Sequence, residues 1–145
     1  MSKVQKIGFG LCFLFVLGGC ATGQLYQEVN IPSVSPDEGR IYFYRNKAAG
    51  FGSGIRPAIN VNGLTVGRAI SGGFFYVDRR EGFYQISVKS DLKENVVSID
   101  LKNGEERYIN LQTKVGLMTY RVVPVLVGPE KGFREMQDCK FDRDF

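Results

Sequence analysis

The chain has 145 residues, of which 43% are hydrophobic, 12% aromatic and 23% charged, and its formal net charge is +4. This length fits one domain, and the composition excludes an intrinsically disordered chain. Histidine is absent. Its absence excludes catalysis by Ser-His or Cys-His pairs and metal sites that need histidine ligands.

The first nineteen residues have the pattern of a secretory signal peptide. Lys3 and Lys6 give a positive start, and residues 7–17 form an apolar run interrupted by glycines. As a helix this run spans roughly 16 Å at ~1.5 Å per residue, whereas a bilayer core is about 30 Å thick. We therefore predict that residues 1–19 are a signal peptide rather than a membrane span.

The end of this segment resembles the lipobox of bacterial lipoproteins. Leu17, Gly18 and Gly19 stand before Cys20, as an aliphatic and two small residues stand before the obligatory cysteine of that motif. The resemblance implies that Cys20 becomes the first mature residue, with diacylglycerol on its sulfur and an acyl chain such as palmitate on its amine. The alternatives are a plain signal peptide with an incidental cysteine, or an uncleaved anchor.

The lipobox also implies a location. The chain would be exported and membrane-anchored, with the membrane as its partner through the lipid on Cys20. Ala21 rather than Asp follows the cysteine, which resembles outer-membrane sorting in enteric lipoproteins. In a Gram-negative host we therefore expect the outer membrane, with the domain facing the periplasm.

Cleavage before Cys20 changes the charge and the cysteine inventory. Loss of Lys3 and Lys6 lowers the Lys and Arg count from 19 to 17 against 15 Asp and Glu, so the net charge falls from +4 to +2. Cys12 leaves with the signal peptide, and Cys139 then carries the one free thiol, so no internal disulfide is possible. We expect a buried, apolar thiol, with a redox or partner-binding role as the alternative.

Residues 20–37 are predicted to form the lipidated N-terminus and a tether, and residues 38–145 the folded domain. Pro32 and Pro36 favour extended backbone. At ~3.3 Å per residue the stretch 21–37 could reach roughly 55 Å. Part of it could pack as an edge strand, because it contains the apolar residues Tyr26, Val29 and Ile31.

Beyond the tether, the apolar residues repeat with the period of β-strands. Strands are predicted over residues 40–45, 58–61, 64–69, 73–79, 83–89, 96–101, 106–112 and 117–127, with a short last strand within 133–139. Asn62-Gly63 predicts a tight hairpin, and residues 102–105 predict a second one. Pro124 indicates an edge strand or a bulge. The spacing favours an antiparallel β-sandwich, immunoglobulin-like or Greek-key, of about seven to nine short strands, or a small barrel, with no helix of ordinary length.

Aromatic residues stand next to one another at positions 42–44 and 74–76, so their side chains point to both faces of their strands. One row should belong to the core. We expect the other row to lie under the tether or loops, and the alternative is a binding surface.

Screening for chemistry finds no coherent catalytic constellation. The glycine-rich stretch 48–54 lacks the Gly-Lys-Ser/Thr ending of a phosphate loop and precedes a strand, so it predicts a mobile loop. Ser90 and Lys93 match a Ser-x-x-Lys motif, but they fall in a turn rather than on a helix. We predict no enzyme activity, no metal, no cofactor and, given the scattered basic residues, no nucleic-acid partner.

Several stretches together resemble a family of bacterial lipoprotein domains, the domain of unknown function 2846. They are residues 39–45, 59–63 with Gly67, 73–78, 82–86 and 104–109, within a similarity that spans about residues 37–127. This chain has Glu81-Gly82 where the family often has Pro-Gly. The resemblance implies a fold and a place in the cell envelope, and it supplies no catalytic residue.

Together these features predict a lipid-anchored cell-envelope protein that acts as a non-catalytic binding or structural module. Its partner would be an envelope protein or a glycan, held at exposed strand edges or by the loop that carries Lys47, Phe51, Ser53 and Arg56. Two alternatives remain: a small-ligand carrier with an aromatic-lined cavity, and a hydrolase of envelope polymers that uses Asp/Glu or Ser/Lys. A cavity through the core would favour the carrier, and a filled core with an exposed edge favours the binding module.

Overall fold

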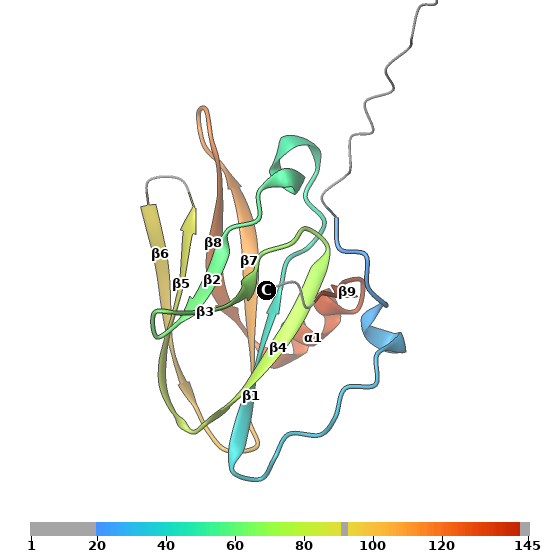
Figure 1. Cartoon of the computed structure of the whole chain (residues 1–145), viewed down its shortest axis with the longest axis vertical. Helices are drawn as coiled ribbons and strands as arrows, with labels where there is room; N and C mark the ends of the chain where they lie inside the picture. The colour runs from blue at the N-terminus through green and yellow to red at the C-terminus, as the bar shows by residue number, and fades with distance from the viewer. Residues whose placement is uncertain (1–19, 91–92, 143–145) are drawn as a thin grey trace, which may run out of the picture.

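The computed structural model describes residues 20–90 and 93–142 as a β-sandwich of two sheets (Figure 1). The predicted signal peptide, with Leu17, Gly18 and Gly19, lies outside the described residues. The strands are β1 (Glu38–Tyr44), β2 (Ala58–Val61), β3 (Leu64–Arg68), β4 (Gly73–Arg80), β5 (Gly82–Ser90), β6 (Lys93–Leu101), β7 (Glu106–Val115), β8 (Tyr120–Val127) and β9 (Lys140–Phe141). Two short 3₁₀ helices, η1 (Tyr26–Glu28) and η2 (Gly50–Gly54), and one α-helix, α1 (Pro129–Met136), complete the described fold. The predicted all-β sandwich is confirmed.

One sheet has the order β8-β7-β1-β4-β9 and the other β3-β2-β5-β6. The five-stranded sheet is mixed, because β1 pairs parallel with β7 and β4 pairs parallel with β9. The hairpin predicted at residues 102–105 is wrong, since this turn crosses from β6 in one sheet to β7 in the other. β7 is buried on both faces from Tyr108 to Leu111, so it fits the middle of a covered sheet better than an edge beside β6.

Two turn predictions are confirmed. Asn62 and Gly63 join β2 to β3 with φ values of 49° and 80°, as a two-residue hairpin with positive φ at both positions requires. Pro124 lies on β8, an edge strand that pairs with β7 alone. A proline there removes no ladder hydrogen bond on the open side.

The strand predicted within residues 133–139 is wrong. Helix α1 covers most of this stretch, and the short β9 follows it. Pro129 lies in the first turn of α1, and the buried Gly132 and Met136 are four residues apart on one helix face. A Cβ on Gly132 would lie 2.4 Å from the Cβ of Tyr108, so glycine allows the helix to approach β7 closely.

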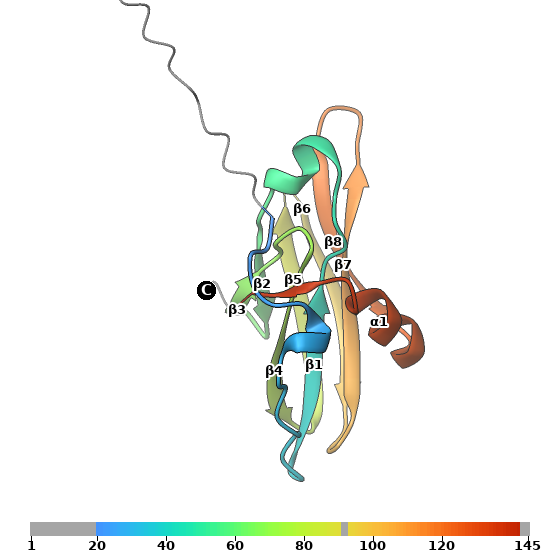
Figure 2. The ribbon, with the colours of Figure 1, turned by 90° about the vertical axis from the view of Figure 1, so that its right-hand side faces the viewer.

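The buried side chains form two clusters. Figure 2 shows α1 and the N-terminal segment beside the five-stranded sheet. Phe43 and Phe75 belong to the core between the sheets, where their rings stack at 5.0 Å. The alternate row on the outer face of the five-stranded sheet, including Tyr42 and Phe74, packs under the N-terminal segment and α1. The second aromatic row is therefore a second core, as expected, rather than an open surface.

The segment expected to be a tether lies along the domain. The amide of Ala21 donates to Ser71 O at 3.1 Å, and that of Tyr26 donates to Cys139 O at 3.0 Å. The Tyr26 ring packs edge-on against Phe74 at 5.3 Å. Tyr26, Val29 and Ile31 are partly buried against the outer cluster of this sheet. The segment is therefore held against the domain and cannot act as a free spacer over these residues. Among residues 20–90 and 93–142, no helix combines the length and apolarity needed to cross a bilayer.

Candidate functional site

An open groove of about 510 Å³ lies between the loop that follows β1 and the β7–β8 hairpin. Its walls mix amide, hydroxyl, amine and apolar side chains, and none of them is a carboxylate, a serine or a cysteine. The lining residues are Asn46, Lys47, Ala48, Ala49, Asn110, Leu111, Gln112, Thr113, Val115 and Tyr120.

A partly buried polar network holds two amides of this groove, those of Asn110 and Asn46. The Asn110 side chain donates to Glu135 Oε2 at 2.9 Å and to Asn46 Oδ1 at 3.3 Å. The Tyr44 hydroxyl donates to the same Glu135 oxygen at 2.6 Å. Burial, with the hydrogen bond to Glu135, raises the pKa of Tyr44, so its phenol stays neutral and remains a donor. Helix α1, which carries Glu135, therefore sets the orientation of the groove amides.

Arg45 attaches the loop to the groove. Its side chain is 1% exposed and donates to the carbonyl oxygens of Ile55 (2.5 Å), Ala69 (2.8 Å) and Gly52 (2.6 Å). Two further bonds reach Thr113 Oγ1, at 3.2 and 2.9 Å. Within the described residues no carboxylate pairs with it, and burial lowers the pKa of this guanidinium. The loop predicted to be mobile is thus held by Arg45 through Gly52, and the residue that follows the loop, Ile55, accepts a second bond from Arg45.

The four loop residues singled out from the sequence have different surroundings. Lys47 lines the groove. Ser53 donates to Gly50 O at 2.8 Å and so stabilises its own turn. Arg56 is exposed, and its carbonyl accepts a bond of 3.3 Å from Arg68. The side chain of Phe51 lies outside what the structure describes. Arg45 was not among the residues predicted from the sequence, although an arginine at the end of an apolar strand, before a glycine-rich loop, is a usable indication.

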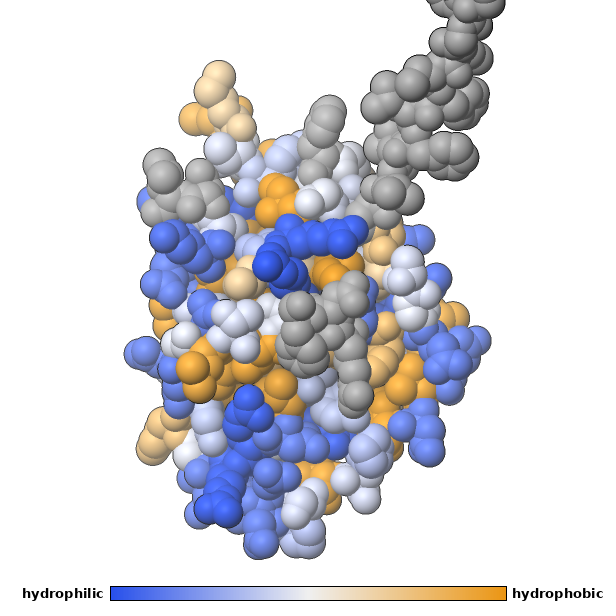
Figure 3. Space-filling view, in the orientation of Figure 1, coloured by the Kyte–Doolittle hydropathy of each residue, from blue (hydrophilic) through white to orange (hydrophobic). Residues whose placement is uncertain are grey.

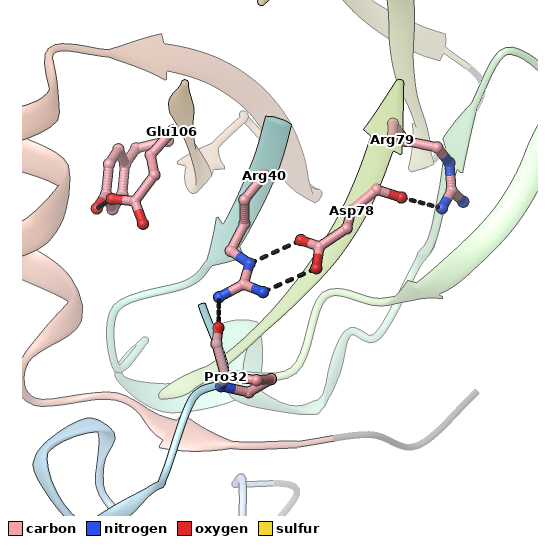
Figure 4. Close-up of polar contacts among 6 residues, drawn as sticks. Pro32, Arg40, Asp78, Arg79 and Glu106 are labelled. Atoms are coloured by element: carbon pink, nitrogen blue, oxygen red, sulfur yellow. Dashed lines mark hydrogen bonds and ion pairs between the residues drawn. The ribbon is translucent and has the colours of Figure 1, made fainter. Parts of the chain in front are cut away.

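A second pocket, of about 470 Å³, lies under the N-terminal segment and contains Arg40. Figure 4 shows this guanidinium between Asp78 and Pro32. Its Nε and Nη2 donate to the Asp78 carboxylate, both at 2.7 Å, and Nη1 donates to Pro32 O at 2.8 Å. The guanidinium carbon lies 4.0 Å from the Tyr76 ring centroid. Every nitrogen of this side chain is engaged, so the pair clamps the N-terminal segment rather than offering a free anion site.

The tyrosines beside this pocket are not acid–base groups at physiological pH. The Tyr108 hydroxyl donates to Glu106 Oε2 at 2.8 Å, and its ring stacks on Tyr42 at 5.0 Å. Burial raises the pKa of Tyr42 to about 12 and raises that of Tyr108 as well. General acid–base catalysis works best with a pKa near the operating pH.

The nucleophile candidates are used inside the fold. Ser90 Oγ accepts from Val122 N at 2.9 Å and donates to Val122 O at 3.1 Å, which ties β5 to β8. Lys93 is exposed at the start of β6. Cys139 is buried, and burial raises the pKa of its thiol to about 12. The described residues contain no cluster of three or more His, Cys, Asp or Glu side chains that could hold a metal ion.

Cys20 is exposed and forms an isolated parallel bridge with Ser71.

The model of a family described as protein of unknown function (DUF2846) matches residues 35–124, which run from just before β1 to the middle of β8. No match to the chain was found among curated proteins or among solved structures. The matched residues make up more than half of the chain, and the predicted resemblance to the DUF2846 family is confirmed, while the predicted lipoprotein character stays a prediction. The chain therefore belongs to the DUF2846 family of proteins of unknown function.

Proposed function

We propose that this protein is a lipid-anchored module of the cell envelope that binds another envelope component, a protein or a glycan, without catalysis. The observation that carries the proposal is the groove of about 510 Å³, in which Glu135 holds the amides of Asn110 and Asn46. Preorganised polar groups beside apolar side chains are typical of binding sites, because little conformational freedom is lost on binding.

The lipid anchor is proposed on Cys20. Its exposed side chain at the edge of the domain, directly before the packed residue Ala21, supports this assignment because an attached lipid would meet no obstruction from the core. Two or three acyl chains on one residue are expected to give stable attachment, whereas one chain binds a membrane only marginally.

The composition of the groove favours binding over hydrolysis. A glycoside hydrolase needs two facing carboxyl groups, and an acyl-transfer enzyme needs a nucleophile beside a base. None of the groove-lining side chains is a carboxylate, serine or cysteine, and the hydroxyl of Thr113 accepts two bonds from Arg45.

The packing of the core favours a binding module over a small-ligand carrier. The space between the sheets is filled by Phe43, Phe75 and the aliphatic residues around them. Both pockets described above are open to solvent. A carrier of the predicted kind would need an enclosed aromatic cavity instead.

Site-specific photo-cross-linking in intact cells tests this function. A photo-reactive amino acid replaces Gln112, which lines the groove, or Gln85, an exposed glutamine on the other sheet, as the matched control. We expect one discrete adduct from position 112 alone, suppressed by Tyr120→Ala in the groove wall. Absence of an adduct at position 112, or the same adducts at both positions, would contradict a groove-bound partner. The mass and protease sensitivity of the adduct distinguish a protein from a glycan.

A further inference from the structure

The tip of the β7–β8 hairpin is the most exposed apolar feature among the described residues. Leu117 and Met118 are fully exposed, and Val115 is 74% exposed. The tip is closed by a bond from Gly116 N to Thr119 O at 2.7 Å. Hairpin turns usually carry Gly, Asn or Asp, whose conformations the turn requires. Two large apolar residues there gain nothing from the fold itself, so their exposure needs another explanation.

This tip and Cys20 lie in the same half of the molecule. Figures 1 and 2 show the β7–β8 tip and η2 at one end of the long axis, with the start of the described chain in the same half of the molecule. Hydrogen bonds connect Cys20 to one wall of the groove, and the base of the hairpin contributes to the lining of the same groove. Cys20 pairs with Ser71, whose hydroxyl accepts a bond from Ala48 N at 2.8 Å, and Ala48 lines the groove with Tyr120. A lipid on Cys20 would therefore hold the tip close to the membrane surface, with no free spacer between them.

The balance of basic and acidic side chains differs between the two ends of the long axis. At the Cys20 end, seven exposed or half-exposed bases stand on strand ends and in the loop. The acids near them include Glu94, opposite Lys89, and Glu135, whose carboxylate accepts bonds from Tyr44 and Asn110. The bases are Lys47, Arg56, Arg68, Lys89, Lys93, Lys114 and Arg121. At the opposite end the acids exceed the bases. Those acids are Asp37, Glu38, Asp78, Glu81, Asp100, Glu105 and Glu106, against Arg40, Arg79, Arg80, Lys102 and Arg107.

We propose that the β7–β8 tip, through Leu117 and Met118, enters the interface of the bilayer that holds the lipid of Cys20, while the surrounding bases contact anionic headgroups. The inference rests on the proposed lipidation of Cys20. Apolar residues flanked by Lys and Arg are the composition of segments that insert about 5–10 Å into the headgroup boundary. Each base near an anionic surface adds electrostatic attraction. The hairpin tip is orange and pale orange in Figure 3, and it projects beyond the rest of that end.

The orientation that results would place the groove beside the membrane and the acidic end away from it. Val115 and Tyr120 belong both to the groove wall and to the base of the hairpin. A partner bound in the groove would thus lie next to the lipid surface.

The chain contains no tryptophan, so a single introduced tryptophan reports its own surroundings. Leu117→Trp places this reporter at the tip. Phe83→Trp is the matched control, because Phe83 is 80% exposed at the start of β5, at the opposite end. The full, lipidated chain is reconstituted on vesicles of phosphatidylcholine and phosphatidylglycerol, with or without bromine on the acyl chains. Flotation of the same sample reports attachment independently of the tip.

We expect both proteins to float and brominated lipid to reduce the emission of Leu117→Trp about twofold, with no change for Phe83→Trp. Flotation without quenching of Leu117→Trp would overturn the insertion of the tip and leave the anchor intact. Equal quenching of both reporters would also overturn the insertion of the tip, because such a result would mean that the domain has no fixed orientation on the membrane. Failure to float would contradict the anchor, and the inference that rests on it would fall as well.

Discussion

Arg45 at the end of β1 donates two hydrogen bonds to Thr113 Oγ1 on β7, at 3.2 and 2.9 Å, while its other donors hold carbonyl oxygens of the adjoining loop. One buried guanidinium thus joins the floor of the groove to the loop beside it. Because its partners are mostly neutral carbonyls, the cost of burying this charge is offset by hydrogen bonds rather than by an ion pair.

Replacing this guanidinium should destabilise the fold and loosen the loop. Arg45→Met leaves the buried carbonyls of Ala69 and Gly52 without this donor, so we expect the free energy of unfolding to fall by about 2–4 kcal/mol. Thr113→Val should lower it by about 1–2 kcal/mol, because two donors lose one acceptor. Urea unfolding measures both, with the exposed Arg56→Met as control. A change below about 0.5 kcal/mol in Arg45→Met would contradict this role.

The Arg40–Asp78 pair should show strong coupling. Arg40 is 2% exposed, so Asp78→Ala leaves a buried guanidinium without its counter-charge and should lower the free energy of unfolding by about 3 kcal/mol. Adding Arg40→Met to that variant should restore part of the loss, since no buried charge remains. The exposed Arg80→Ala is the control and should change stability by less than about 0.5 kcal/mol. Urea unfolding of the two single variants and the double variant measures the coupling. If the two single losses of unfolding free energy simply add up in the double variant, the pairing is contradicted.

The close approach of α1 to β7 depends on Gly132. Gly132→Ala brings a Cβ within 2.4 Å of the Tyr108 Cβ, so the helix must shift and stability should fall by about 1–3 kcal/mol. Gly128→Ala meets no atom within 4 Å and should be nearly neutral. The shift should also disturb Glu135 and, through it, the groove amides, which chemical shifts of the Asn110 side chain would report. Equal stability of the two variants in thermal unfolding would contradict the packing described here.

Alkaline pH should destabilise the protein. Burial raises the pKa of Cys139 and of Tyr42 to about 12, and it raises those of Tyr44 and Tyr108 as well. In the unfolded chain these groups ionise near about 8.5 for a thiol and about 10 for a phenol. Above those values the unfolded chain binds fewer protons than the folded chain, so the free energy of unfolding falls as pH rises. Urea midpoints should be steady from about pH 6 to 8 and decrease beyond about pH 9. Midpoints that stay constant to about pH 10.5 would show that these groups titrate normally in the folded chain.

The fold was accessible from the sequence where local geometry decides it. Asn62-Gly63 determines its own turn, because both residues readily take positive φ. The alternation of apolar and polar residues from Tyr84 to Lys89 likewise marks β5 without reference to its neighbours. The parallel pairing of β1 with β7 was not accessible, because it joins residues about 65 positions apart through tertiary packing. Helix α1 was mistaken for a strand because Gly132 lowers helix propensity, and its role is visible only once Tyr108 lies against it.

The candidate site was accessible only in part. Lys47 could be named because it lies in the longest irregular stretch, but the opposite wall comes from β7 and β8, which folding brings to it. Arg45 escaped notice because its partners are mainly backbone carbonyls, which leave no residue pattern in a sequence. The packing of the N-terminal segment against the domain could not be predicted for a similar reason. Pro32 accepts the bond from Arg40 through its backbone carbonyl, which leaves no residue pattern in the sequence.

The central claim is that Cys20 is the membrane anchor of this module, and an intact mass measurement tests it most directly. The native chain is expressed, the membranes are washed with high salt, and the detergent-extracted protein is weighed. The account predicts a species that begins at Cys20 and carries two or three acyl chains, and that is lost in Cys20→Ala. An unmodified mass with a different first residue would contradict the anchor and, with it, the membrane-facing orientation of the β7–β8 tip.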